Sequence, residues 1–314
     1  MRVASNSYTD TMLNQFNTLI SKEDTLQGEV STGLSVQAPS DNPTAMAETL
    51  NDLTDQAAQT QYSTNITNLQ SSATSVYNAM DSLQKIISSA DEIATNAGSG
   101  TTSTADMANY ASQVQQLIQQ AVQLGNTQDP VSGQYLFGGT ASTSEPFTTT
   151  TDANGNVTGV AYQGNTSVNE VPVAAGTTVS VDVPGANTTG SGTRGLFTDS
   201  QSGADLFNHL LALQNDLTSG DTSAIATDGA NLQKDENNVT YQVANNGAVQ
   251  TRLNNEATYA TNQATSLTSA ISNTSGADLV QTMVQLNQTQ TAYQAALQSS
   301  AQIMQLSILN YLPT

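Results

Sequence analysis

Apolar residues recur at alternating spacings of three and four through the first and last parts of the chain, whereas a middle stretch lacks this pattern. The spacing is typical of helices that pack along a narrow seam, as in coiled coils. We expect one helix over residues 9–30. A second should start at Pro43 and continue for about fifty residues, against a globular average of about 11–12. Further seams over residues 107–124, 206–271 and 279–304 predict more long helices.

The middle stretch, residues 138–198, is rich in threonine, valine and glycine and contains segments that alternate with a period of two. This pattern is typical of short strands joined by tight turns. The chain therefore predicts a mainly α fold: a long antiparallel coiled-coil or helical-bundle rod from the N- and C-terminal segments, with a small β-rich insert domain. We expect terminal polymerisation helices at residues 1–42 and 276–314, an α-helical rod core at 43–137 and 199–275, and the outer insert at 138–198.

The charge balance restricts the classes of partner. The 314 residues include 26 acidic residues against 6 lysines and arginines, a formal net charge of −20. Nucleic acids and anionic membrane surfaces require a basic footprint, so neither is expected as a partner. The absence of cysteine excludes disulfides and thiolate chemistry. Because no apolar run reaches ~18 residues and no secretory signal pattern is found, we expect neither membrane insertion nor a cleaved signal peptide.

Candidates for catalysis are few. A lone histidine on a helix is more often a packed or solvated residue than a catalyst, and His209 is the single histidine here. Acidic residues of the insert could pair as acid and base in a secreted hydrolase, although their spacing does not place them together in space. These residues are Glu145, Asp152, Glu170 and Asp182. A carboxylate-dependent hydrolase stays an alternative, but we expect no enzyme activity and no cofactor.

One segment of the insert resembles the start of a calcium loop. The run "DANGNVTG", which begins at Asp152, places oxygen ligands at alternate positions. An EF-hand loop needs a bidentate glutamate at its twelfth position, and this chain has Gln163 there. The pair Asn154–Gly155 is instead typical of a tight hairpin turn. We therefore favour a turn over a metal site.

The two ends of the chain carry more apolar surface than one helix partner can cover. The run "IMQLSILNYL" at residues 303–312 is apolar on nearly all sides, as buried helices are. Burial of the first seam gains on the order of 10 kcal/mol. Ordering about twenty residues costs on the order of 20–40 kcal/mol in backbone entropy. We therefore expect neighbouring subunits to cover an assembly surface of Met12, Phe16, Leu19, Leu26, Leu279, Leu286, Leu297, Ile303, Met304, Ile308, Leu309 and Leu312.

Three stretches resemble the flagellin superfamily and, within it, the hook–filament junction proteins. The run "STGLSVQAPSDNPTAMA" (residues 31–47) is similar to the turn after the first helix, with its "SGL…SDDP" pattern. The run "GQYLFGGT" (residues 133–140) resembles the "YLFAGT" signature of junction proteins, and residues 278–312 resemble their C-terminal polymerisation helix. The opening "MRVASNSYTDTM" lacks the "INTN" start of filament flagellins, which favours the junction proteins.

The resemblance implies a structural, non-enzymatic protein of the bacterial flagellum that polymerises as a short segment between hook and filament. It implies export in an unfolded state through the flagellar type III apparatus to an extracellular position, without a cleaved signal peptide. The implied partners are copies of itself in a ring or helical assembly, flagellin, the adjacent hook-associated protein and an export chaperone. A filament flagellin, which would form long polymers from purified protein alone, stays the main alternative.

Overall fold

The computed structural model describes the backbone of residues 2–309 and the side chains of residues 10–302. The chain divides into two compact units. Unit 1 combines the first part of the chain, up to Ala58, with the last part, from Gln263 on, and unit 2 is the continuous segment between them. The two longest helices, α2 (Pro43–Gly98) and α5 (Thr222–Ser275), each contribute one end to unit 1 and the rest to unit 2. The predicted mainly α fold is confirmed.

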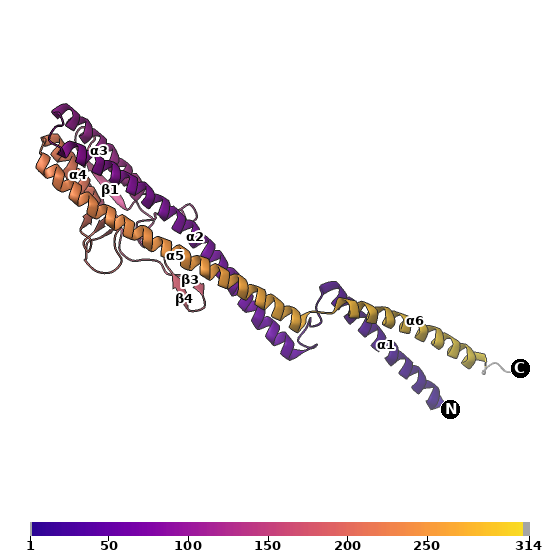
Figure 1. The fold of residues 1–314 in the computed structure, drawn as a ribbon. Coiled ribbons are helices and arrows are strands. Elements are labelled where there is room, and N and C mark those ends of the chain that lie inside the picture. The colour runs from indigo at the N-terminus through magenta and orange to yellow at the C-terminus, as the bar shows by residue number, and fades with distance from the viewer. Residues whose placement is uncertain (1, 310–314) are drawn as a thin grey trace. The chain divides into compact units, whose positions relative to one another are not determined.

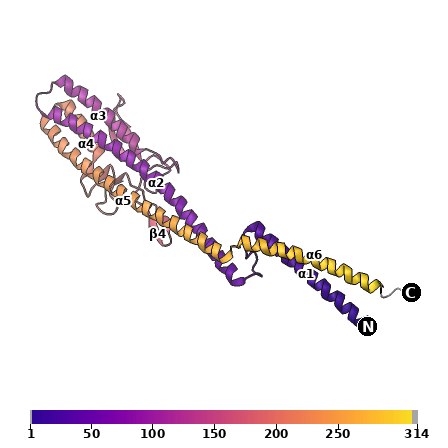
Figure 2. The same ribbon diagram turned by 45° about the vertical axis from the view of Figure 1, so that its right-hand side comes forward.

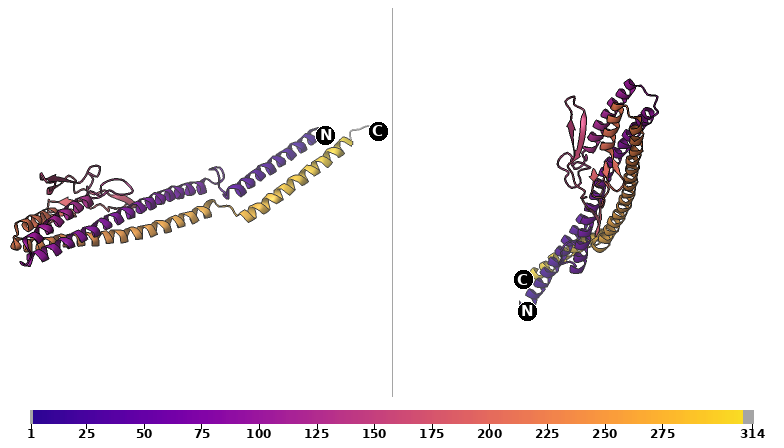
Figure 3. Two further views of the ribbon diagram at one scale, coloured as in Figure 1. Left: turned by 90° about the horizontal axis from the view of Figure 1, so that it is seen from above. Right: turned by 90° about the vertical axis from the view of Figure 1, so that its left-hand side faces the viewer.

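In unit 1, α1 (Arg2–Thr32) and α6 (Leu279–Leu309) lie side by side in each view (Figures 1 and 3). Helix α1 ends at Gly33, whose φ of 72° lies in the left-handed region that favours glycine. Its N–H donates to the Glu29 carbonyl at 2.8 Å and closes the last turn. The left-handed conformation of Gly33 therefore ends α1.

The two linkers of unit 1 pair with each other. The N–H of Ser35 donates to the Ser275 carbonyl at 2.7 Å, and the N–H of Ala277 donates to the Gly33 carbonyl at 2.9 Å. These bonds join the segment after α1 to the segment between α5 and α6. Helix α2 starts at Pro43, as predicted, and Asn42 caps it by accepting an N–H at 3.1 Å.

In unit 2, two shorter helices accompany α2 and α5: α3 (Thr104–Gly125) and α4 (Leu206–Ser219) (Figures 1 and 2). Every seventh residue of α5 enters the core over most of its length, as the coiled-coil spacing predicts. The fully buried members of this seam are Ile225, Leu232, Val239 and Leu253.

Hydrogen bonds between side chains fix the register of α2 against α5. Gln70 Nε2 donates to Asn254 Oδ1 at 2.8 Å, and Gln84 Nε2 donates to Thr240 Oγ1 at 3.1 Å. The two bonds are fourteen residues apart on both helices, and the numbers rise on one helix as they fall on the other. Helices α2 and α5 are therefore antiparallel and keep the same register over two heptads.

Short strands form three small sheets on one side of the helices of unit 2 (Figure 3). Two sheets are antiparallel hairpins, and in the third sheet β6 pairs parallel with β5 and antiparallel with β7. The strands are β1 (Phe147–Thr151), β2 (Val157–Tyr162), β3 (Val171–Ala174), β4 (Thr177–Val179), β5 (Ala186–Asn187), β6 (Thr198–Asp199) and β7 (Ala204–Asp205).

The predicted hairpin turn at Asn154–Gly155 is confirmed between β1 and β2. Asp152 Oδ1 accepts the N–H groups of Asn154 and Asn156, each at 2.8 Å. Gly155 has a φ of 85°, which a side chain would disfavour. The carboxylate that began the calcium-loop pattern thus serves the turn itself.

The insert shares its core with the helices of unit 2. The ring of Phe197, from the segment before β6, stacks on Phe207 of α4 with centres 5.2 Å apart. Phe147 of β1 lies against both rings, at 4.9 and 5.1 Å. A Cβ atom at Gly125, the last residue of α3, would lie 2.6 Å from the Phe147 ring. The β-rich insert is therefore anchored by aromatic residues, which the strand pattern alone did not predict.

Candidate assembly surface

The contact between α1 and α6 has an apolar centre. The ring of Phe16 meets the ring of Tyr293 edge-on, with centres 5.7 Å apart and planes at 81°. On the same helix Leu26 is buried, and Met12 and Leu19 are half-buried. The four apolar residues that the sequence assigned to the first assembly helix are thus at least partly covered within one chain.

Polar side chains extend this contact on both sides of the aromatic pair. Gln290 Nε2 donates to Glu23 Oε1 at 3.0 Å, and Thr282 Oγ1 donates to Glu29 Oε2 at 3.3 Å. Both carboxylates are paired with neutral donors, so these hydrogen bonds align the helices without cancelling charge. The seam between α1 and α6 is therefore narrow and mixed in polarity.

Helix α6 buries small polar residues and leaves large apolar ones outside. Thr282, Thr289 and Ser300 are each at least nine-tenths buried. By contrast, Leu279 and Leu297, which the sequence placed in an assembly surface, are 44% and 46% exposed. Leu286 is half-buried. The described side chains that α6 buries are thus small, and Leu279 and Leu297 stay available to something outside the chain.

The first two turns of α6 carry a continuous apolar patch, here called the α6 patch: Leu279, Val280, Met283 and Val284. Members of the patch are three and four residues apart, so their side chains are neighbours on the helix surface. Val280 is 76% exposed, and the other three are roughly half exposed. Single exposed apolar residues are ordinary, but grouped ones mark interaction sites.

Other helices of unit 1 also expose large apolar side chains. Leu50 and Leu53, in the first turns of α2, are 54% and 43% exposed. On α1, Leu13 and Ile20 are exposed although Leu26 is buried. The apolar surface of unit 1 is therefore not limited to α6.

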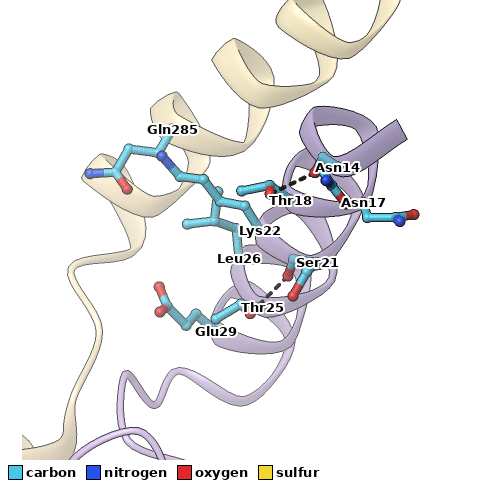
Figure 4. A pocket seen from close by; sticks show the side chains of 9 residues that line it. All are labelled: Asn14, Asn17, Thr18, Ser21, Lys22, Thr25, Leu26, Glu29 and Gln285. Carbon is cyan, nitrogen blue, oxygen red and sulfur yellow. Dashed lines mark hydrogen bonds between the residues drawn. The ribbon is translucent and has the colours of Figure 1, made fainter. Parts of the chain in front are cut away.

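A polar groove of 810 Å³ runs along α1 (Figure 4). Leu26 of α1 and Gln285 of α6 are among the residues that line it. The remaining lining residues, all on α1, are Asn14, Asn17, Thr18, Ser21, Lys22, Thr25 and Glu29. The groove offers amide and hydroxyl groups, together with one ammonium group and one carboxylate.

Unit 1 is strongly acidic. Its described side chains, residues 10–58 and 263–302, include nine acidic residues and a single cation, Lys22. Copies of this unit repel one another electrostatically, so contact between copies must gain its free energy from apolar burial.

The four insert carboxylates that could serve hydrolysis do not all gather at one place. Glu145 is exposed, and Asp152 is used by the β1–β2 turn. Asp182 is half-buried, and this burial raises its pKa, with further increases from the charges of Asp129 and Glu170. The structure thus brings Asp182 near Glu170, and it adds Asp129, which sequence reasoning missed.

Asp129 and Asp182 line a cavity of 270 Å³ in unit 2. Burial opposes ionisation of Asp129, but hydrogen bonds from Ser72 and from the N–H groups of Ser132 and Val131 lower its pKa below the usual value. Asp129 is therefore held as a carboxylate that fastens the turn after α3 to α2. An acid–base pair would need one of its members free to exchange protons with a substrate.

His209 also has a packing partner. Its Nδ1 atom lies 2.7 Å from Asp235 Oδ2, which joins α4 to α5. Among the residues that the structure describes, no group of three or more histidine or acidic side chains is arranged to hold a metal. The described helices also include none that is long and apolar enough to span a bilayer.

Five residues of the predicted assembly surface lie outside the described side chains. They are Ile303, Met304, Ile308, Leu309 and Leu312. Their part in assembly stays a prediction from the sequence.

Comparison with known families is decisive for the class of protein. Residues 3–142 match the N-terminal helical region of bacterial flagellin, and residues 230–312 match its C-terminal helical region. This chain belongs to the flagellin family. The matched segments contain α1 from residue 3 on, all of α2 and α3, and the α6 patch, whereas the strand-bearing insert lies almost entirely between them.

Solved structures share the fold of this flagellin-family chain. A protein described as a flagellar hook-associated protein of Vibrio parahaemolyticus is 19% identical with a TM-score of 0.64, covering 75% of this chain and 100% of its own. FlgL of Xanthomonas campestris is 18% identical with a TM-score of 0.55, covering 69% and 98%. The flagellar junction protein FlgL of Legionella pneumophila is 14% identical with a TM-score of 0.51, covering 74% and 100%. None of the curated proteins matches the sequence.

Proposed function

We propose that this protein is a structural, non-enzymatic component of the bacterial flagellum that polymerises between the hook and the filament. The α6 patch carries the proposal, because its own chain leaves these four apolar side chains in water while it buries Thr282 on the same turns of α6. Covering such a patch with a neighbouring copy gains free energy roughly in proportion to the apolar area removed from water. Solved proteins of the same fold that are named hook-associated or junction proteins support the position in the flagellum.

The partners follow from this position. The protein contacts further copies of itself in a ring or helical assembly, the adjacent hook-associated protein on one side and flagellin on the other. It reaches the outside of the cell without a cleaved signal peptide, accompanied by an export chaperone until then. Residues 303–312, apolar on most sides, extend the assembly surface beyond the α6 patch.

A paired substitution on the α6 patch tests the proposal. The variant Val280→Asp with Met283→Asp should keep the melting temperature of the monomer, because both positions are at least half exposed. In the assembly each new carboxylate would be buried unpaired, which costs at least several kcal/mol. We expect loss of filament attachment and release of flagellin into the medium. Both are measured by electron microscopy and immunoblotting of culture supernatants.

The matched control is Val131→Asp, a valine of unit 2 that is 51% exposed. It adds one carboxylate away from the α6 patch, where the paired variant adds two on the patch, and it should leave filaments attached. Normal filaments in the paired variant, with normal secretion of the protein, would overturn the proposal. The filament-flagellin alternative predicts long polymers from purified protein under salting-out conditions, whereas a junction protein should form none.

A further inference from the structure

Two acidic side chains meet inside unit 2 where α4 turns into α5, a place called here the α4–α5 corner. Helix α4 closes at Gly220, which has a φ of 76° and donates its N–H to the Asp216 carbonyl at 2.8 Å. Asp221 then caps α5, since its Oδ1 accepts the N–H of Ser223 at 3.1 Å. Because two residues link the helices, side chains near the corner are held against one another.

Asp228, in the second turn of α5, is only 5% exposed. Its Oδ2 atom is buried and has no hydrogen-bond donor among the described residues. The carboxyl group of Asp216 lies within hydrogen-bonding reach of the Asp228 carboxyl group. Two carboxylate oxygens can bond only when one carries a proton, because an ionised carboxylate is an acceptor and never a donor. The geometry therefore calls for a shared proton.

Among the described residues, no cation forms an ion pair with Asp228. The other titratable groups on the helices around Asp228 include Asp91 on α2, Asp106 and Tyr110 on α3, His209 on α4, and Lys234 and Asp235 on α5. His209 is bound to Asp235 at 2.7 Å, and Lys234 donates to Asn231 at 2.9 Å. Asp216 also lies in the last turn of α4, where the helix dipole disfavours a negative charge.

These features agree with the direction in which Asp228 titrates. Burial, followed by the charge and contact of Asp216, raises the pKa of Asp228 to about 7, whereas the charge of His209 lowers it. Like-charged carboxyl groups in one site commonly behave in this way, with one of the two retaining its proton.

We propose that Asp216 and Asp228 share one proton across the α4–α5 corner, and that release of this proton to water loosens the corner. Once the proton is lost, two carboxylates face each other beside Leu217 and Ile225, which are fully buried. Repulsion between the two carboxylates in this apolar environment favours separation of α4 from α5 or entry of water. The corner is thus a pH-sensitive part of unit 2.

The sign of the effect follows from proton linkage. The pKa of Asp228 in the folded chain lies above its ordinary value of 3.8. The folded state therefore binds more protons than the unfolded state between these values, and stability falls as pH rises through this window. The contribution of the pair is complete below the unfolded pKa and is lost once the pH exceeds about 7.

The test uses Asp228→Asn in the full chain, since asparagine keeps the shape, donates an N–H to Asp216 and does not titrate. Thermal unfolding is measured at about pH 5 and about pH 8 at constant ionic strength. The unchanged chain should melt at a lower temperature at the higher pH, and Asp228→Asn should lose most of that difference. The control Glu236→Gln removes an exposed acid from the same helix and should keep the difference in full.

A second variant keeps the proposal open to refutation if Asp228→Asn fails to fold. Asp216→Asn lies on the less buried side of the pair and should flatten the pH dependence in the same way. Parallel pH profiles for the variants and the unchanged chain would overturn the shared proton. So would a carboxyl carbon NMR titration in which Asp228 has a midpoint near 4. Either result leaves the assembly proposal untouched, because the α6 patch belongs to unit 1.

Discussion

Both units contain the same apolar spacing, but unit 1 exposes many of the apolar side chains whereas unit 2 buries most of them. Among the described side chains, unit 1 exposes ten large apolar residues, of which none is aromatic. The larger unit 2 exposes four, and three of these are tyrosines, whose hydroxyl groups suit water. In unit 2 the seams of α2 and α5 are covered by α3, α4 and the insert, whereas in unit 1 helix α6 has α1 as its close partner. A seam becomes core or contact surface according to how many elements surround it.

The largest expected effect is the difference in stability cost between truncating a buried side chain of unit 2 and truncating an exposed one of unit 1. Phe197→Ala should lower the free energy of unfolding by about 3–5 kcal/mol, because it opens a cavity among stacked aromatic rings. Leu297→Ala should change the free energy of unfolding by about 0.5 kcal/mol or less, since the side chain is half exposed. Urea titration of the monomer measures both. A cost above about 2 kcal/mol for Leu297→Ala would place this leucine in a core and break the comparison.

A smaller effect is expected at Asp129, which fastens the turn after α3 in unit 2. Asp129→Asn removes a charged acceptor of three hydrogen bonds and should cost about 2 kcal/mol at neutral pH. The pKa of Asp129 is lowered in the folded chain, so its contribution is present above the ordinary value of 3.8 and is lost as the pH falls. Urea titrations of both proteins should therefore converge in acid. A constant difference at every pH would mean that shape, and not charge, sets the cost.

The periodic parts of this fold were predictable from the sequence, and the parts that depend on distant contacts were not. The start of α2 at Pro43 and the heptad seam of α5 follow from local spacing and capping. The β1–β2 turn follows from one asparagine–glycine pair. Local pattern gave no sign that Phe147 and Phe197 would meet Phe207, because their contact joins residues far apart in the chain.

The same division holds for the candidate site. Spacing identified Phe16 and Leu26 as part of the α1 seam, and both are covered by the fold. Spacing did not show that Val280 would be exposed. On a helix that is apolar on several sides, spacing alone does not determine which side packs against the partner helix. That choice is set by Thr282 and Thr289, whose small side chains let α1 and α6 approach.

The smallest expected effect comes from removing hydrogen bonds between helices. It tests whether these bonds contribute to the difference between the units. Gln84 Nε2 donates to a threonine hydroxyl in unit 2 at 3.1 Å, and Gln56 Nε2 does the same in unit 1 at 2.9 Å. Both bonds are exposed, so water can replace the lost partner, and Gln→Ala should cost about 0.5 kcal/mol or less at either site. Hydrogen exchange of the α2 amides around each glutamine measures the two costs separately. Equal losses would mean that coverage of apolar side chains alone distinguishes the units. A loss at Gln56 several times that at Gln84 would show that unit 1, with fewer buried apolar residues, relies on its polar contacts to hold α2 against α5.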